Sequence, residues 1–253
     1  MKNIVLILAA LFTLYIGLIR PLLRRRRYQQ FRREVGTNPA LRSQYYVESL
    51  AEPWFWLVAI GILLLLDSAP LSVLGLQVPD NWEPTFWFLA EIVVLLPILS
   101  VVMRYRIAKT QRPGLAVLLL DIKELLPRTP YELFLWFLIS ITAGICEEIV
   151  FRGFLLAYSS SLLSYLFGLQ IPFFFTIVLS SILFGFAHIY QGWKGAVGAG
   201  FAGIALAYLY VVTGSLILPI IVHILLDIRI VFIAPALLKL DSETPNNVPG
   251  QNA

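Results

Sequence analysis

Three short groups that contain ionisable residues lie inside hydrophobic stretches of the chain. They read CEEIVFRG at 146–153, FGFAH at 184–188 and HILLD at 223–227. The second and third groups contain His188 and His223, the only histidines of the chain. An ionisable side chain deep in a membrane helix costs about 2.5–3.5 kcal/mol on insertion scales, so such residues usually serve a function. These groups therefore form the candidate site.

The first group contains two neighbouring glutamates whose surroundings are expected to differ. Glu148 and Arg152 are four residues apart, so they share one helix face and can form an ion pair. Glu147 points about 100° away from Glu148 on a helix. We therefore expect Glu148 to be neutralised in place while Glu147 faces a cavity. A purely structural role for the Glu148–Arg152 pair is the alternative.

The two histidines each have a partner at helical spacing. His223 and Asp227 are four residues apart, so the Asp227 carboxylate could accept the imidazole N–H and fix its tautomer. Phe184 precedes His188 by one turn, where its ring can form a wall beside the imidazole. We expect both histidines to be held in defined orientations.

Two kinds of site would use these residues if their helices converge. In the first, a carboxylate takes a proton from water, and the imidazoles stabilise the oxyanion. In the second, Glu147, His188 and His223 bind zinc and leave a fourth position open. Glu148 would then have to act as the base although it pairs with Arg152, which lowers its basicity. The metal-independent site is therefore favoured, and zinc remains the alternative.

The composition of the chain is that of a protein with several membrane helices. Hydrophobic residues make up 59% and charged residues 13% of the 253 residues, and the mean hydropathy is +0.82. A soluble domain has about 45–50% apolar and about 25% charged residues. The chain therefore lacks the polar surface of a soluble enzyme or a nucleic-acid-binding domain. Its single cysteine excludes an internal disulfide framework. We expect an all-α polytopic transmembrane helical bundle.

The apolar runs predict about seven to eight membrane spans. A span needs about 20 apolar residues, and seven such runs occur at 4–19, 53–68, 86–103, 131–156, 172–190, 195–213 and 216–238. Eight arginines in 20–42 and six basic residues in 104–130 place these two loops in the cytoplasm. Seven spans then put the N-terminus outside and the C-terminus inside.

Other segments carry weaker signals. Residues 114–126 are too short to span a bilayer and predict an interfacial amphipathic helix, and the polar tail 241–253 is predicted to be disordered. Glu91 and Arg229 are further ionisable residues within spans, and Glu91 has no partner at helical spacing. Small residues recur every four positions and predict close packing of a neighbouring helix: Gly195, Ala199, Gly203 and Ala207.

The three groups, in this order, resemble the motifs of the CPBP intramembrane protease family, also called the Abi or type II CAAX prenyl endopeptidase family. The family pattern is EExxxR, then FxxxH, then Hxxx followed by Asn or Asp. It is matched by Glu147, Glu148, Arg152, Phe184, His188, His223 and Asp227. The resemblance covers about 130–240. It divides the chain into N-terminal spans (1–125), a catalytic helical bundle (126–240) and the tail (241–253).

The resemblance implies an integral membrane endopeptidase that hydrolyses a peptide bond within or beside the bilayer. It implies that Glu147 activates water with help from His188, and that His223 and residue 227 stabilise the oxyanion. Glu148 and Arg152 would hold the site together. The prenyl endopeptidases have Asn where this chain has Asp227, and an ionised Asp cannot donate a hydrogen bond to an oxyanion. Family members are described both as metalloproteases and as glutamate-dependent enzymes, so the resemblance leaves zinc open.

Two other functions are compatible with the sequence. A non-catalytic membrane adaptor or immunity protein would keep the polar residues for structure alone. A proton-coupled transporter would use them as a relay, although the chain lacks the interrupted helix pair expected of inverted repeats. For the protease, we expect a membrane-associated protein or peptide substrate, prenylated or not, and no nucleic acid. The protein would lie in the lipid bilayer of a prokaryotic cell membrane or of an organelle.

Overall fold

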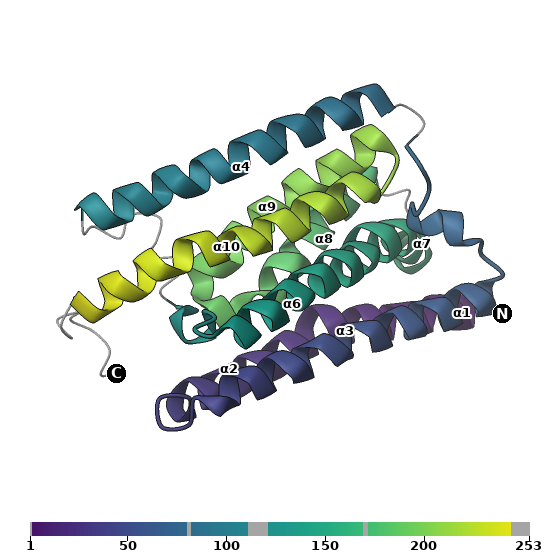
Figure 1. Ribbon diagram of the computed structural model, residues 1–253. Coiled ribbons are helices and arrows are strands. Elements are labelled where there is room, and N and C mark those ends of the chain that lie inside the picture. Colours follow the sequence, from purple (N-terminus) through teal and green to yellow (C-terminus); the bar gives the residue numbers. More distant parts are fainter. Residues whose placement is uncertain (1, 80–81, 111–120, 169–171, 244–253) are drawn as a thin grey trace.

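The computed structural model describes residues 2–79, 82–110, 121–168 and 172–243. These residues form helices joined by short connections, and no strand occurs among them (Figure 1). This arrangement confirms the predicted all-α class.

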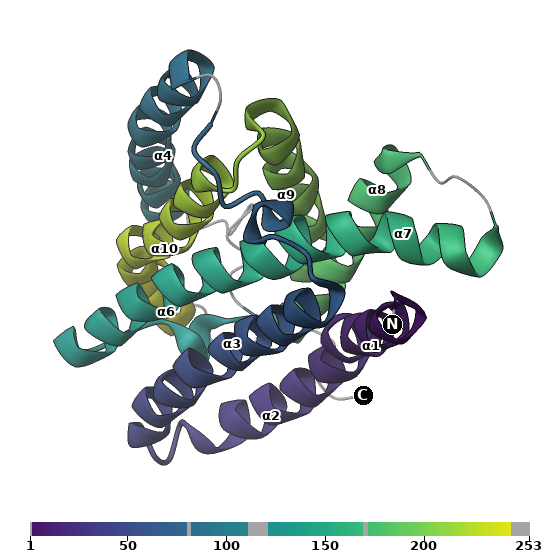
Figure 2. The same cartoon turned by 90° about the vertical axis from the view of Figure 1, so that its right-hand side faces the viewer.

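The N-terminal part of the chain forms a long helical hairpin. α1 (Lys2–Leu14), a π-helical turn (Tyr15–Ile19) and α2 (Arg20–Glu34) follow one another without a break. α3 (Ala40–Asp67) then returns beside them (Figure 2). A 3₁₀ turn (Leu71–Leu74) follows α3.

The prediction that the basic stretch 20–42 is a loop is wrong, because most of it lies in α2. Arginine is a good helix former, and its long side chain can reach either water or an acidic partner. On the side that faces α3, Arg20 pairs with Glu52 and Arg27 with Glu48. These ion pairs attach the basic helix to its neighbour.

A second continuous helix runs through the middle of the molecule (Figure 2). It consists of α6 (Pro130–Glu148), a π-helical segment (Ile149–Phe154) and α7 (Leu155–Phe167). Its start is fixed by a capping box, in which the Thr129 side chain accepts from the Glu132 backbone and the Glu132 side chain accepts from the Thr129 backbone. The first motif thus lies at the junction of α6 and the π-helical segment.

The remaining helices pack around this central helix. α3 lies on one side of α6, and α10 (Ile217–Glu243) lies on another, with α4 (Trp82–Thr110) packed outside α10 (Figure 1). α8 (Phe173–Ala187), a 3₁₀ turn (Ile189–Gln191) and α9 (Gly192–Thr213) form a hairpin. The second motif therefore ends α8, and the third lies in α10.

Six helical segments of the described residues are long and apolar enough to cross a membrane, and the chain is an integral membrane protein. They are Ile4–Glu34, Ala40–Asp67, Phe86–Arg106, Pro130–Tyr165, Ile189–Thr213 and Ile217–Lys239. The span predicted at 172–190 is the shorter helix α8 of 15 residues, because Pro172 precedes it and a 3₁₀ turn follows His188. The predicted placement of the two termini on opposite sides depended on seven spans and is not supported by six.

Two weaker predictions concern segments that the structure describes only in part. Of the interfacial helix predicted at 114–126, residues 114–120 lie outside the described residues, and 123–125 form a 3₁₀ turn rather than an α-helix. Of the tail at 241–253, the first three residues continue α10, so that part of the prediction is wrong. Residues 244–253 lie outside the described residues.

Glycines allow α8 and α9 to approach closely. A Cβ on Gly185 would lie 2.7 Å from the Ala196 carbonyl oxygen and 3.1 Å from the Gly200 Cα. A Cβ on Gly203, one of the predicted small residues, would lie 3.3 Å from the Ser181 Cα. The predicted close approach is confirmed, and α8 is the helix that makes it.

We expect Gly185→Ala to lower the stability of the protein by about 1–3 kcal/mol, because the new methyl group meets backbone atoms that cannot move independently. The measurement is the thermal unfolding midpoint of purified protein in detergent. Gly198→Ala on α9 is the matched control, since its Cβ would meet nothing within 4 Å. Equal midpoints for the two variants would contradict the close contact.

Candidate active site

A buried carboxylate joins the first and third motifs. Arg152 Nη1 donates a hydrogen bond of 2.8 Å to Glu148 Oε1, which confirms the predicted ion pair. His223 Nδ1 lies 2.7 Å from the same oxygen. Glu148 is fully buried and Arg152 nearly so. One carboxylate oxygen therefore connects the central helix to α10.

The guanidinium of Arg152 extends this connection to α8 and α9. Its Nη2 donates to the Gly203 carbonyl of α9 at 3.2 Å. Its Cζ lies 4.2 Å from the centre of the Phe184 ring of α8, in the geometry of a cation–π contact. The absence of a side chain at Gly203 makes room for this group, since a Cβ there would lie 3.3 Å from Nη2. Arg152 thus contacts α8 and α9 as well as Glu148 of its own continuous helix.

The π-helical segment Ile149–Phe154 contains Arg152 and follows Glu148 directly. π-Helical turns are rare and often occur at functional sites. All six residues of this segment are buried. Gly153 faces the 3₁₀ turn after α3, where a Cβ would lie 2.8 Å from the Leu74 carbonyl oxygen. The irregular turn therefore lies in the buried interior of the molecule.

Glu147 and His188 face each other next to this buried network. Glu147 Oε2 lies 3.8 Å from His188 Nε2 and makes no hydrogen bond with the described residues. His188 Nδ1 lies 2.9 Å from the Phe184 carbonyl oxygen, so Nδ1 carries the hydrogen of the neutral ring and Nε2 faces Glu147 as an acceptor. The two adjacent glutamates thus have the different surroundings that helical spacing predicted.

The predicted partner of His223 is wrong. Asp227 Oδ2 lies 3.9 Å from His223 Nε2, too far for a hydrogen bond, whereas Glu148 holds Nδ1. A carboxylate on a neighbouring helix reaches the imidazole more closely than the carboxylate one turn away on α10. Asp227 instead lines a cavity together with Glu147 and His188.

Phe184 brings the two imidazoles together. Its ring centre lies 4.6 Å from that of His188 and 5.8 Å from that of His223. The side chains of all three motifs therefore meet in one place, at the junction of the central helix, α8 and α10. Arg229 follows Asp227 on α10. Glu91 is exposed on α4 and lines neither of the cavities described below.

Glu147 lies in the wall of two neighbouring cavities. One has a volume of about 190 Å³ and the other of about 90 Å³. Both are also lined by Arg24 of α2 and by Tyr45 and Ser49 of α3. The sequence does not indicate these residues, because the arginine-rich stretch 20–42 predicts a loop and because residues 1–125 contain no motif. Nothing in the sequence distinguishes Arg24 from the other arginines of α2.

The described residues include no group of three or more His, Cys, Asp and Glu side chains arranged to hold a metal ion. Nδ1 of each imidazole is engaged, by Glu148 for His223 and by Phe184 for His188, so these bonds do not use Nε2. Among the described residues, the three predicted zinc ligands Glu147, His188 and His223 do not form such a group in this arrangement.

Residues 129–229 match the family model described as Type II CAAX prenyl endopeptidase Rce1-like. This segment is Rce1-like. The resemblance inferred from the three motifs is confirmed, and the match runs from the capping box of α6 into α10, so it includes every predicted site residue. Searches of curated proteins and of solved structures found no match. The Rce1-like family is one of membrane CAAX proteases, and α1 to α4 lie outside the matched segment.

We expect Arg152→Ala to destabilise the protein and to remove its activity. Breaking a buried ion pair by removing one partner costs about 3–5 kcal/mol, and the low end applies because His223 still contacts Glu148. The thermal unfolding midpoint in detergent should fall clearly, whereas Arg25→Ala, which changes an exposed arginine of α2, should leave it unchanged. An Arg152→Ala protein as stable as the wild type would show that the pair contributes nothing to the fold.

Proposed function

We propose that the protein is an integral membrane endopeptidase in which Glu147 activates water to hydrolyse a peptide bond of a membrane-associated protein or peptide. The observation that carries this proposal is the buried Oε2 of Glu147, which has no hydrogen-bond partner among the described residues and faces His188 across 3.8 Å in the wall of two cavities. The Rce1-like segment supports the same reaction class.

The surroundings of the two glutamates support a division of roles. Glu148 accepts from Arg152 and contacts His223, and both contacts reduce its ability to take a proton. Glu147 has no such cation bound to it and lies beside space for a substrate. We therefore assign the base to Glu147, and to Glu148 the task of positioning His223.

In the proposed reaction, a water molecule between Glu147 and His188 gives a proton to the Glu147 carboxylate. A separation of 3.8 Å is too long for a direct hydrogen bond and fits one bridging water. The resulting hydroxide forms a bond to the carbonyl carbon of the substrate. Glu147 then passes its proton to the amide nitrogen as the C–N bond breaks, which releases an amine and a carboxylic acid.

His223 stabilises the oxyanion in this proposal. The Glu148 carboxylate at Nδ1 and the Asp227 carboxylate at 3.9 Å from Nε2 both favour the protonated imidazole. A protonated ring presents an N–H at Nε2 that can donate to developing negative charge. Asp227 therefore acts through His223, which avoids the difficulty that an ionised Asp cannot itself donate.

We propose that this hydrolysis needs no metal ion. The donor set supports this view, because the described residues include no group of three His, Cys, Asp or Glu side chains arranged to hold a metal ion. If Glu147 bound a metal, the base would have to be Glu148, which is occupied by Arg152. The metal-free reaction requires no change in these contacts.

We expect Glu147→Gln to lower the rate of peptide cleavage by about 10²–10⁴-fold, because it removes the base. Its insertion into the membrane and its thermal midpoint should match the wild type. Glu91→Gln is the matched control, since Glu91 is an exposed membrane-helix glutamate away from the cavities. Full activity of Glu147→Gln would refute the role of Glu147. A wild-type protein that binds peptides but cleaves none would point to the adaptor function.

We expect chelators to leave the activity of purified protein unchanged. The measurement combines elemental analysis of active protein with a chelator titration of the cleavage rate. Zinc present in a one-to-one ratio, with loss of activity on its removal and recovery on its return, would refute the metal-independent reaction. Glu147, His188 and His223 would then have to move together as ligands.

A further inference from the structure

The larger cavity beside Glu147 has a basic wall. α2 contributes Arg20, Arg24 and Arg27 to it, each close to Glu147 or to the residues of α3 opposite. These arginines lie outside the Rce1-like segment. Each of them carries a positive charge, because arginine stays protonated in proteins.

Two of these arginines already have their partners. Arg20 Nε lies 2.8 Å from Glu52 Oε1, and Arg27 pairs with Glu48. Arg24 forms no ion pair with any of the described residues. Among the arginines of this cavity, Arg24 is therefore the one whose charge is left for another group.

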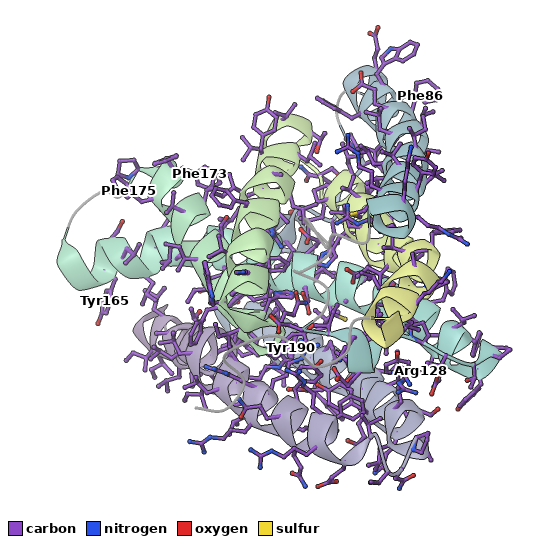
Figure 3. All side chains as sticks on the ribbon, turned by 90° about the vertical axis from the view of Figure 1, so that its left-hand side faces the viewer. Phe86, Arg128, Tyr165, Phe173, Phe175 and Tyr190 are labelled. Carbon is purple, nitrogen blue, oxygen red and sulfur yellow. The ribbon has the colours of Figure 1, made fainter. Side chains whose placement is uncertain are left out.

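Arg24 is nevertheless held in place. Its Cζ lies 4.1 Å from the ring centre of Tyr190, which follows the second motif, and it also lines the smaller cavity with Tyr190 and Glu147. Figure 3 shows Tyr190 where the start of the α9 region meets α2. The stack covers one face of the guanidinium, and Tyr45 forms a side-chain hydrogen bond with Arg24. A guanidinium has five N–H donors in its plane, so donors remain for a further partner. The edge of a guanidinium binds a carboxylate through two parallel hydrogen bonds.

We propose that Arg24 is a specificity-determining residue that binds a carboxylate of the substrate, namely the free C-terminal carboxylate of a peptide. This proposal rests on the proposed function of the site. Glu147 and Arg24 line the same two cavities, so a peptide whose carboxylate lies on Arg24 brings its last residues past the base. Tyr45 and Ser49, which line both cavities, add hydroxyl groups along this path.

The test compares cleavage of one peptide in two forms, with a free C-terminal carboxylate and as the C-terminal amide. The wild type should cleave the acid with a kcat/KM at least about tenfold higher, because a charge-assisted bidentate contact is lost with the amide. Arg24→Gln should cleave both forms at the wild-type rate for the amide, and the change should lie mainly in KM. Arg24→Lys should keep a reduced preference for the acid.

Arg25→Gln, an exposed neighbour that lines neither cavity, should keep the full preference. A third peptide, an amide with Asp as its last residue, identifies the source of the carboxylate: rapid cleavage of it would transfer the contact to an acidic side chain and overturn the C-terminal assignment. If Arg24→Gln fails to fold, the preference of the wild type and its reduction in Arg24→Lys decide the matter.

Equal cleavage of acid and amide by the wild type would overturn the role of Arg24 and leave the proposed protease intact. Cleavage of no peptide by the wild type would instead refute the proposed function. If Arg24→Gln lowers kcat/KM by the same factor for both peptides, Arg24 acts on Glu147 and not on the substrate carboxylate. If Arg24→Gln lowers the cleavage rate only in vesicles that contain phosphatidylglycerol, Arg24 binds a lipid headgroup. Either result would overturn carboxylate binding.

Discussion

A carboxylate that has been removed from water needs cations and hydrogen-bond donors, and the helices around Glu148 supply them to its Oε1. One oxygen of Glu148 contacts both Arg152 and His223. Arg152 in turn reaches the Gly203 carbonyl of α9 and the Phe184 ring of α8. The central helix, α8, α9 and α10 are therefore connected through one group of charges, in a medium that offers no water to replace any of them.

The close packing of the helices follows from the same requirement. A Cβ at Gly203 would crowd Arg152, at 3.3 Å from its Nη2, and a Cβ at Gly185 would lie 2.7 Å from the Ala196 carbonyl oxygen of α9. The π-helical turn contains Arg152 itself. The small residues, the π-helical turn and the buried Glu148–Arg152 pair thus belong to one packed region. The neighbouring Glu147 has no arginine partner in it.

Local spacing predicted the parts of the site that depend on one helix. The Glu148–Arg152 pair and the different direction of Glu147 follow from helix geometry, and the helical fold follows from composition. The Glu148–His223 contact could not be predicted, because it joins residues 75 positions apart and competes with the nearer Asp227. Arg24 could not be predicted for a related reason. A run of arginines after an apolar span predicts a polar loop, whereas here Arg20 and Arg27 pair with glutamates of α3 and the stretch is helical. The length of α8 was predicted wrongly, because the apolar run 172–190 extends beyond the helix, which ends before the 3₁₀ turn that follows His188.

The arginines of α2 also fix how deep the site lies. An apolar segment precedes Arg20 in the same continuous helix, and Arg20, Arg24 and Arg27 line the cavity that contains Glu147. The candidate site therefore lies at the level where the basic part of this helix begins, away from the middle of the hydrocarbon layer. At this depth, water can reach the cavity from the basic face of the membrane without crossing the apolar layer.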